Sequence, residues 1–177
     1  MAIRVIDTEL AGARLFVPDV FKDDRGYFKE TYSRRKYREL GLDDEFVQDG
    51  ISLSSQNVIR GLHGDREMSK LVGVLQGRAW DVIVDARRDS PSFGKWQSFE
   101  LSEDNHVQLY VPKGFLHGFL ALTDGLIFSY KQSAHYEPER EFAARWDDPT
   151  LAILWPLTGE ARVSEKDQRN PAFAEIR

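Results

Sequence analysis

Short apolar runs that alternate with polar residues dominate the second half of this chain. Within 79–86, Trp80, Val82 and Val84 alternate with Asp81, Ile83 and Asp85, the period that places one face of a β-strand on a core. Similar runs recur about every ten residues, with turn-forming residues between them. They predict strands at 71–75, 79–86, 96–101, 106–111, 115–122 and 126–132, the first two joined by a tight turn at Gln76-Gly77.

The first half of the chain has a weaker pattern. Short extended segments are expected at 5–6, 13–17, 27–32 and 46–48, with a turn at 23–26 and a polar loop at 52–57. Ser33 is a suitable N-cap for a short helix over 34–40, which Gly41 would end. The polar tail after Pro156 is expected on the surface.

These elements predict an all-β fold, a sandwich or barrel with few short helices, rather than alternating strands and helices. With 177 residues, no internal repeat and no linker, the chain is expected to form one domain over 1–177.

Composition narrows the classes of function. The chain is 41% hydrophobic and 30% charged, as globular domains are, and its net charge of −5 argues against nucleic acid as a partner. It has no cysteine, which excludes disulfides and thiolate chemistry. No apolar run approaches the ~18 residues of a membrane helix, and the N-terminus lacks a signal-peptide layout. We therefore expect a cytoplasmic protein without a membrane partner.

The candidate chemistry is concentrated in residues 59–72. Arg60, His63 and Lys70 lie there between two apolar runs. A histidine exchanges protons near neutral pH, a nearby cation stabilises an oxyanion, and an arginine binds phosphate. This set is suited to proton abstraction next to a carbonyl on a phosphorylated substrate.

Motifs along nearly the whole chain resemble those of the dTDP-4-dehydrorhamnose 3,5-epimerases, sugar-nucleotide epimerases of the cupin class. They occur in the family's order, which makes the resemblance specific. The matching stretches are DDRGYFKE (23–30), FVQD (46–49), RGLH (60–63), KLV (70–72), DVIVDARR (81–88), SPSFGKW (90–96), PKGFLHGF (112–119), SYK (129–131), WDDP (146–149), WPL (155–157) and SEKD (164–167).

The resemblance implies a jelly-roll β-sandwich, a homodimer, a nucleotide-diphosphate sugar as substrate, and no metal or cofactor. It implies His63 as the base, oriented by Asp167, Tyr130 as the acid on the opposite face of the sugar, and Lys70 as the residue that stabilises the enolate. The implied ligand contacts are His117 near the keto oxygen, Arg60, Arg25 and Lys166 on the diphosphate, and Glu30, Gln48, Tyr136 and Glu141 around the nucleoside.

Two departures from the family pattern concern the substrate. Gly64-Asp65 replaces an aromatic residue and a glutamine, with a shorter loop to Lys70, and Gly50 replaces the usual asparagine. Together with YKQS (130–133) they resemble a branch that epimerises GDP-linked 4-keto heptoses, so the nucleotide, the sugar and the number of inverted centres stay open.

Two other functions compete with an epimerase. A metal-dependent cupin enzyme needs about three histidines and a carboxylate around one ion, and the chain has four histidines without an H-x-H pair. A non-catalytic module that binds sugar nucleotides would not need both an acid and a base. Individual residues also have structural readings: His117 and Tyr130 could pack in a core, Arg25 could brace its turn, and Asp167 could be solvated.

Overall fold

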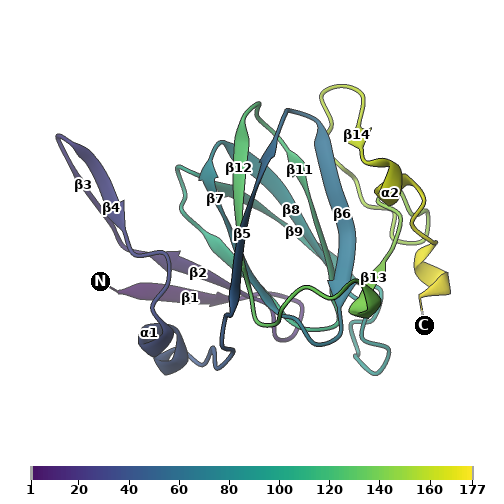
Figure 1. Ribbon diagram of the computed structural model, residues 1–177, viewed down its shortest axis with the longest axis horizontal. Coiled ribbons are helices and arrows are strands. Elements are labelled where there is room, and N and C mark those ends of the chain that lie inside the picture. Colours follow the sequence, from purple (N-terminus) through teal and green to yellow (C-terminus); the bar gives the residue numbers. More distant parts are fainter. Residues whose placement is uncertain (1, 177) are drawn as a thin grey trace.

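The computed structural model describes residues 2–176 and is built almost entirely from β-strands (Figure 1). The strands are β1 (Ile3–Asp7), β2 (Arg14–Pro18), β3 (Val20–Asp23), β4 (Gly26–Lys29), β5 (Gln48–Ser54), β6 (Val58–Asp65), β7 (Lys70–Gln76), β8 (Arg78–Asp85), β9 (Trp96–Ser102), β10 (Gln108–Val111), β11 (Phe115–Ala121), β12 (Leu126–Gln132), β13 (Glu141–Ala143) and β14 (Arg162–Val163). The short helices are α1 (Arg34–Glu39), α2 (Glu165–Gln168) and the 3-10 helices η1 (Pro138–Arg140) and η2 (Phe173–Glu175).

Two sheets form a β-sandwich of the jelly-roll, cupin-like type. The strand order is β1-β2-β10-β7-β12-β5 in the first sheet and β13-β6-β11-β8-β9 in the second, where β14 also pairs with β6. The all-β prediction is therefore confirmed.

The main core lies between the two sheets. Phe119 of β11 and Phe128 of β12 come from opposite sheets, and their rings stack with centroids 4.3 Å apart. Both side chains are fully buried, as are Val72 and Ile83 in the same cluster. Burying each such side chain contributes about 1.5–3 kcal/mol to holding the two layers together. Ile83 belongs to this core, whereas Val82 and Val84 face a second buried cluster.

The predicted pairing of the first two strong strands is wrong. β7 and β8 follow one another through Gly77, but β7 pairs with β10 and β12 whereas β8 pairs with β9 and β11. The turn carries the chain from one sheet to the other. Each strand then has a partner on both sides and is buried among residues distant in sequence, which alternation alone does not reveal.

Residues 52–54 belong to a strand, not to the predicted polar loop. β5 is an edge strand that pairs only with β12. Ile51 and Leu53 are largely exposed, whereas the small polar residues Ser52 and Ser54 face inward. The inverted polarity explains the error, because a strand that turns polar side chains inward does not show the pattern of a core strand.

The C-terminal tail lies on the surface of the molecule, as expected, and packs against the sandwich through a few buried residues. β14 pairs in parallel with the start of β6, and α2 follows directly beside it (Figure 1). Asp167 of α2 is only 4% exposed. Local pattern does not indicate this packing, which combines strand pairing, the hydrogen bond between His63 and Asp167, and burial of Phe173.

The hairpin β3–β4 projects from the body of the molecule, at the upper left of Figure 1. Its two strands pair only with each other among the described residues. Phe21, Tyr27 and Phe28 on this hairpin are 51%, 51% and 61% exposed. Three aromatic side chains exposed on one projecting element form a surface that a partner can cover.

Helix α1 begins after Ser33, as predicted, although the Ser33 side chain makes no capping bond. Gly41, with φ of 78°, ends the helical segment in the left-handed region that favours glycine. Tyr37 anchors the helix, since it is fully buried with its ring 5.0 Å from that of Phe16. Within residues 2–176, no helix is long and apolar enough to cross a membrane.

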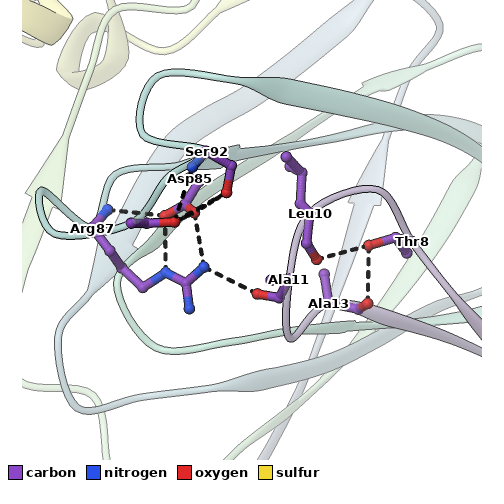
Figure 2. Close-up of polar contacts among 8 residues, drawn as sticks. Thr8, Leu10, Ala11, Ala13, Asp85, Arg87 and Ser92 are labelled. Carbon is purple, nitrogen blue, oxygen red and sulfur yellow. Dashed lines mark hydrogen bonds and ion pairs between the residues drawn. The ribbon is translucent and has the colours of Figure 1, made fainter.

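A buried carboxylate fixes the loop between β1 and β2 to the end of β8 (Figure 2). Asp85 is fully buried and accepts hydrogen bonds from the Arg87 guanidinium and the Ser92 hydroxyl. Arg87 also donates to the carbonyl of Ala11 at 3.0 Å. Burial opposes ionisation of Asp85, but its hydrogen bonds outweigh burial and lower its pKa to about 2.

Candidate active site

One cavity of about 700 Å³ opens between the two sheets and is closed on one side by β14 and α2. Most of the residues that the sequence nominates line it. These are Arg60, His63, Lys70, Tyr130, Tyr136, Glu141, Lys166 and Asp167. They come from both sheets and from the C-terminal tail, so only the folded chain brings them together.

His63 and Asp167 form a hydrogen-bonded pair within this cavity. The His63 Nε2 atom lies 2.7 Å from Asp167 Oδ1, and the Gly61 backbone N–H donates to Asp167 Oδ2 at 3.3 Å. Burial favours the neutral acid, but the bonds from His63 and Gly61 prevail and lower the pKa of Asp167. An ionised Asp167 accepts the proton on Nε2, which leaves Nδ1 of His63 as the basic nitrogen.

Gly61 allows β6 to approach β11 closely beside His63. Its φ is 129°, and a Cβ atom there would lie 2.6 Å from the Cα of Gly118 on β11. Any larger residue would push the two strands apart at the point where His63 faces His117 across the ladder. The requirement for glycine at this position of the RGLH motif is therefore steric.

Lys70, the first residue of β7, is a half-buried cation that lines the cavity. Within residues 2–176 its ammonium group makes no hydrogen bond or ion pair with another side chain. Burial lowers its pKa, while the carboxylates of Glu141, Asp65 and Asp81 oppose that shift. An ammonium surrounded by acidic groups but not bonded to them can bind an incoming oxygen.

Tyr130 of β12 lies in the sheet opposite to that of His63. Its hydroxyl is 3.1 Å from the Ser52 hydroxyl on β5, and its ring lies 5.0 Å from that of Phe128. Burial raises the pKa of Tyr130 to about 12, and the hydrogen bond with Ser52 and the charge of Arg60 limit that rise. Tyr130 is therefore a protonated phenol at neutral pH.

Cationic side chains surround the wall formed by β14 and α2. Arg60, Arg162 and Lys166 all line the cavity. Arg60 is held by donating to Ser54 Oγ and to the Leu53 carbonyl, both at 3.0 Å, whereas Lys166 is paired with Glu141. Three cations on one wall suit a ligand with more than one negative charge.

Four nominated residues do not line the cavity in the single chain. Arg25 lies at the tip of the β3–β4 hairpin, 86% exposed and bonded to Asp23. Glu30, just after that hairpin, is paired with Lys36 at 2.8 Å.

The other two lie closer to the site. Gln48 accepts from the backbone N–H of Tyr136 and donates to Gln132, so it supports the rim. His117 is 5% exposed beside His63, and its Nε2 is 2.9 Å from Asp81 Oδ2.

The sequence did not point to several residues of the cavity wall. The missed side chains include Ser52, Met68, Gln132, Arg162 and Ser164. Ser52 and Arg162 lie in segments that resemble a loop and a solvated tail. The sequence signal that could have located this segment is Ser164, because a serine before an acidic turn is typical of a helix N-cap. In the structure Ser164 is the N-cap of α2 and accepts a hydrogen bond from the Asp167 N–H.

The residues present do not form the donor set of a metal-dependent cupin. Among residues 2–176, no group of three or more His, Asp or Glu side chains is arranged to hold a metal ion. His63 and His117 are each bonded to a separate carboxylate, and His106 contacts Lys29 on the far hairpin.

A β-sandwich whose cavity joins a His–Asp pair, a half-buried lysine and a phenol has the groups of an acid–base enzyme. Comparison with known proteins identifies the family. The profile described as dTDP-4-dehydrorhamnose 3,5-epimerase matches residues 7–175. The chain belongs to the dTDP-4-dehydrorhamnose 3,5-epimerase family.

Individual relatives agree over almost the full length of both chains. The chain is 45% identical to a dTDP-4-dehydrorhamnose 3,5-epimerase of Escherichia coli, covering 94% of this chain and 92% of that one. It is 44% identical to the protein of the same name from Methanothermobacter thermautotrophicus, covering 93% and 91%. A crystal structure of dTDP-6-deoxy-D-glucose-3,5-epimerase from Legionella pneumophila, in complex with dTDP-4-keto-L-rhamnose, superposes with a TM-score of 0.96 at 40% identity, covering 99% and 95%.

Proposed function

We propose that this protein is an isomerase that inverts C3 and C5 of a dTDP-linked 4-keto-6-deoxy sugar. The observation that carries the proposal is the presence in one cavity of the His63–Asp167 pair and Tyr130, which come from facing sheets. A ligand between the sheets would have a base on one side and an acid on the other. Family membership supplies the class of substrate.

His63 is proposed as the base. The 4-keto group acidifies the C–H bonds at C3 and C5, so a neutral imidazole can remove a proton when the resulting enolate is stabilised. Asp167 holds the proton of Nε2 and leaves Nδ1 free to accept. As the imidazolium forms, the carboxylate stabilises its positive charge.

Lys70 is proposed to stabilise the enolate oxygen. Its ammonium has no bonded partner among residues 2–176, so no ion pair has to break before it binds the keto oxygen. Because the cavity lies between two sheets, a charge interaction there is stronger than it would be in bulk solvent. His117, bonded to buried Asp81, is proposed to approach the same oxygen from β11.

Tyr130 is proposed to return the proton on the opposite face of the ring, which is what inverts the centre. With a pKa raised by burial to about 12, it holds its proton until the enolate carbon takes it. The chemistry needs no redox cofactor, because the substrate already carries the ketone.

The cationic wall is proposed to bind the diphosphate. Arg60 and Lys166 were expected there from the sequence, and Arg162 joins them from β14. Lys166 would exchange part of its ion pair with Glu141 for a phosphate. Tyr136, 47% exposed at the rim, is available to stack on the base, next to Gln48.

A homodimer is proposed to complete this site. Arg25 and Glu30 lie on or beside the projecting hairpin and away from the cavity of their own chain. The exposed aromatic residues of the hairpin and the exposed Ile51 and Leu53 of edge strand β5 are surfaces that a second copy would bury. The hairpin of one subunit would then carry Arg25 to the cavity of the other.

The test is proton exchange on a panel of dTDP-, GDP-, CDP- and UDP-linked 4-keto sugars in D₂O. We expect NMR to show deuterium at both C3 and C5 of the dTDP sugar, and loss of this exchange in His63→Ala. Faster turnover of a GDP-linked 4-keto heptose would replace the proposed substrate with the alternative. Absence of exchange on every sugar would exclude the epimerase.

A cytoplasmic location stays a prediction.

A further inference from the structure

The hydroxyl pair between Ser52 and Tyr130 is the contact in the cavity that the proposed mechanism has not used. The two oxygens are 3.1 Å apart. They belong to neighbouring strands, since Tyr130 is opposite Gly50 in the ladder and Ser52 is one inward-facing position further along β5. Both residues line the cavity. The contact therefore joins the phenol to a second hydroxyl that also reaches the ligand space.

Apolar packing fixes the Tyr130 ring, whereas a hydrogen bond fixes its hydroxyl oxygen. The ring contacts the core beside Phe128. Among residues 2–176, Ser52 is the hydrogen-bond partner recorded for the Tyr130 hydroxyl, and Tyr130 is the one recorded for Ser52. A serine hydroxyl has one proton to donate and two lone pairs. Ser52 can thus donate to the tyrosine oxygen and still accept from solvent in the cavity.

Inversion of both C3 and C5 requires that the acid be reprotonated during the reaction. If one tyrosine protonates both C3 and C5, it must regain a proton between the two events. Its surroundings make this difficult, because burial disfavours the phenolate that remains after the first transfer. A donor already in contact with the oxygen removes that difficulty.

We infer that Ser52 is a positioning residue and proton relay for Tyr130, and that it resets the acid between the two inversions. This inference rests on the proposed function. The Tyr130 O–H bond breaks as the new C–H bond forms. The phenolate then takes the Ser52 proton while Ser52 takes one from a solvent water. The hydroxide left in solvent is neutralised by the proton that His63 releases.

The experiment compares two outcomes of one enolate in D₂O. Deuterium returned from the His63 side gives exchanged substrate with its configuration retained, and protonation from the Tyr130 side gives inversion. In Ser52→Ala we expect inversion to fall about 10- to 100-fold, the factor expected for a hydrogen bond to a charged group, while exchange with retention continues. The singly inverted sugar should accumulate, because the second protonation is delayed.

Two further variants separate this effect from damage to the fold. Ser52→Thr keeps the hydroxyl and should restore the wild-type ratio of inversion to exchange. Ser129→Ala removes a hydroxyl from the adjacent position of β12, where it donates to the Gly73 carbonyl on the opposite face, and should leave the ratio unchanged.

An unchanged ratio in Ser52→Ala would overturn the inference, and so would an equal loss of exchange and inversion, which indicates damage to the fold or to binding. Failure of the wild-type protein to exchange either proton is a different result. It would reject the proposed function itself, and the inference with it.

Discussion

His63 and Asp167 are 104 positions apart in the chain, yet His63 Nε2 and Asp167 Oδ1 are separated by 2.7 Å. The contact exists because β14 pairs with the start of β6 and places α2 over His63. The proposed base is thus oriented by the tail of the chain, and the first prediction concerns this bond.

Asp167→Asn is expected to lower kcat/KM by about 10²- to 10⁴-fold, the range of general acid–base catalysis. An amide cannot stabilise the imidazolium as a carboxylate does, and it no longer fixes the proton on Nε2. Deuterium exchange at C3 and C5 measures the effect. The matched control is Glu165→Gln in the same helix, an 88% exposed side chain that pairs with Arg169 and should be neutral. Wild-type exchange in Asp167→Asn would remove Asp167 from the mechanism.

Lys70 sets the expected alkaline limit of activity. Burial lowers its pKa below the ~10.4 of a free lysine, and its protonated form is the one that stabilises the enolate. Activity should therefore decline as pH rises through this lowered value. In Lys70→Arg the decline should disappear, since a guanidinium stays charged, although kcat should fall because its geometry differs. The measurement is kcat/KM from about pH 6 to about pH 10.5. An identical alkaline limb in both proteins would assign the limit to another group.

The same lysine is expected to reduce stability. A lysine whose pKa is lower in the folded than in the unfolded state destabilises the fold while both states are protonated. The penalty is relieved progressively as pH rises from the folded-state pKa to the unfolded-state pKa. At neutral pH, Lys70→Met should therefore raise the melting temperature, by about 2–4 °C for each 1 kcal/mol relieved, while abolishing turnover. Thermal unfolding of both proteins tests this, and a lower melting temperature for Lys70→Met would contradict it.

The proposed dimer predicts complementation between two inactive proteins. Arg25→Ala and His63→Ala should each be nearly inactive alone. If Arg25 acts in the cavity of the partner, a mixed dimer contains one cavity with both wild-type residues. Random exchange of subunits should then restore about a quarter of wild-type activity. Activity that stays at the level of the separate variants would show that Arg25 and His63 act within one chain or not together.

Substituting alanine for two glycines, Gly64 and Gly50, should change stability to very different extents. A Cβ at Gly64 would lie 2.3 Å from the Phe142 ring and 2.7 Å from the Phe115 carbonyl oxygen, whereas one at Gly50 would meet no atom within 4 Å. Gly64→Ala is expected to cost about 1–3 kcal/mol of unfolding free energy and to displace β13, which carries Glu141. Gly50→Ala should change stability little. Urea denaturation of the pair tests this, and equal stabilities would contradict it.

The sequence by itself determined the class of fold and the chemistry of the cavity. Strands such as β8 and β11 were predictable as short apolar runs between turn-forming residues, although both faces of these strands are buried. His63 and Lys70 are residue types that already indicate proton abstraction next to a carbonyl, and the family resemblance added Tyr130.

Only the tertiary structure decided which strands pair and which polar residues enter the site. Local pattern does not state a strand's partner, so β7 and β8 looked like neighbours although they lie in opposite sheets. Ser52 and Arg162 looked like loop and tail because inward-facing polar residues are recognised only when the cavity they face is known. The pairing of Asp167 with His63 was implied by the family resemblance, but local pattern gave no sign of it, since long-range hydrogen bonds leave no periodicity in the chain.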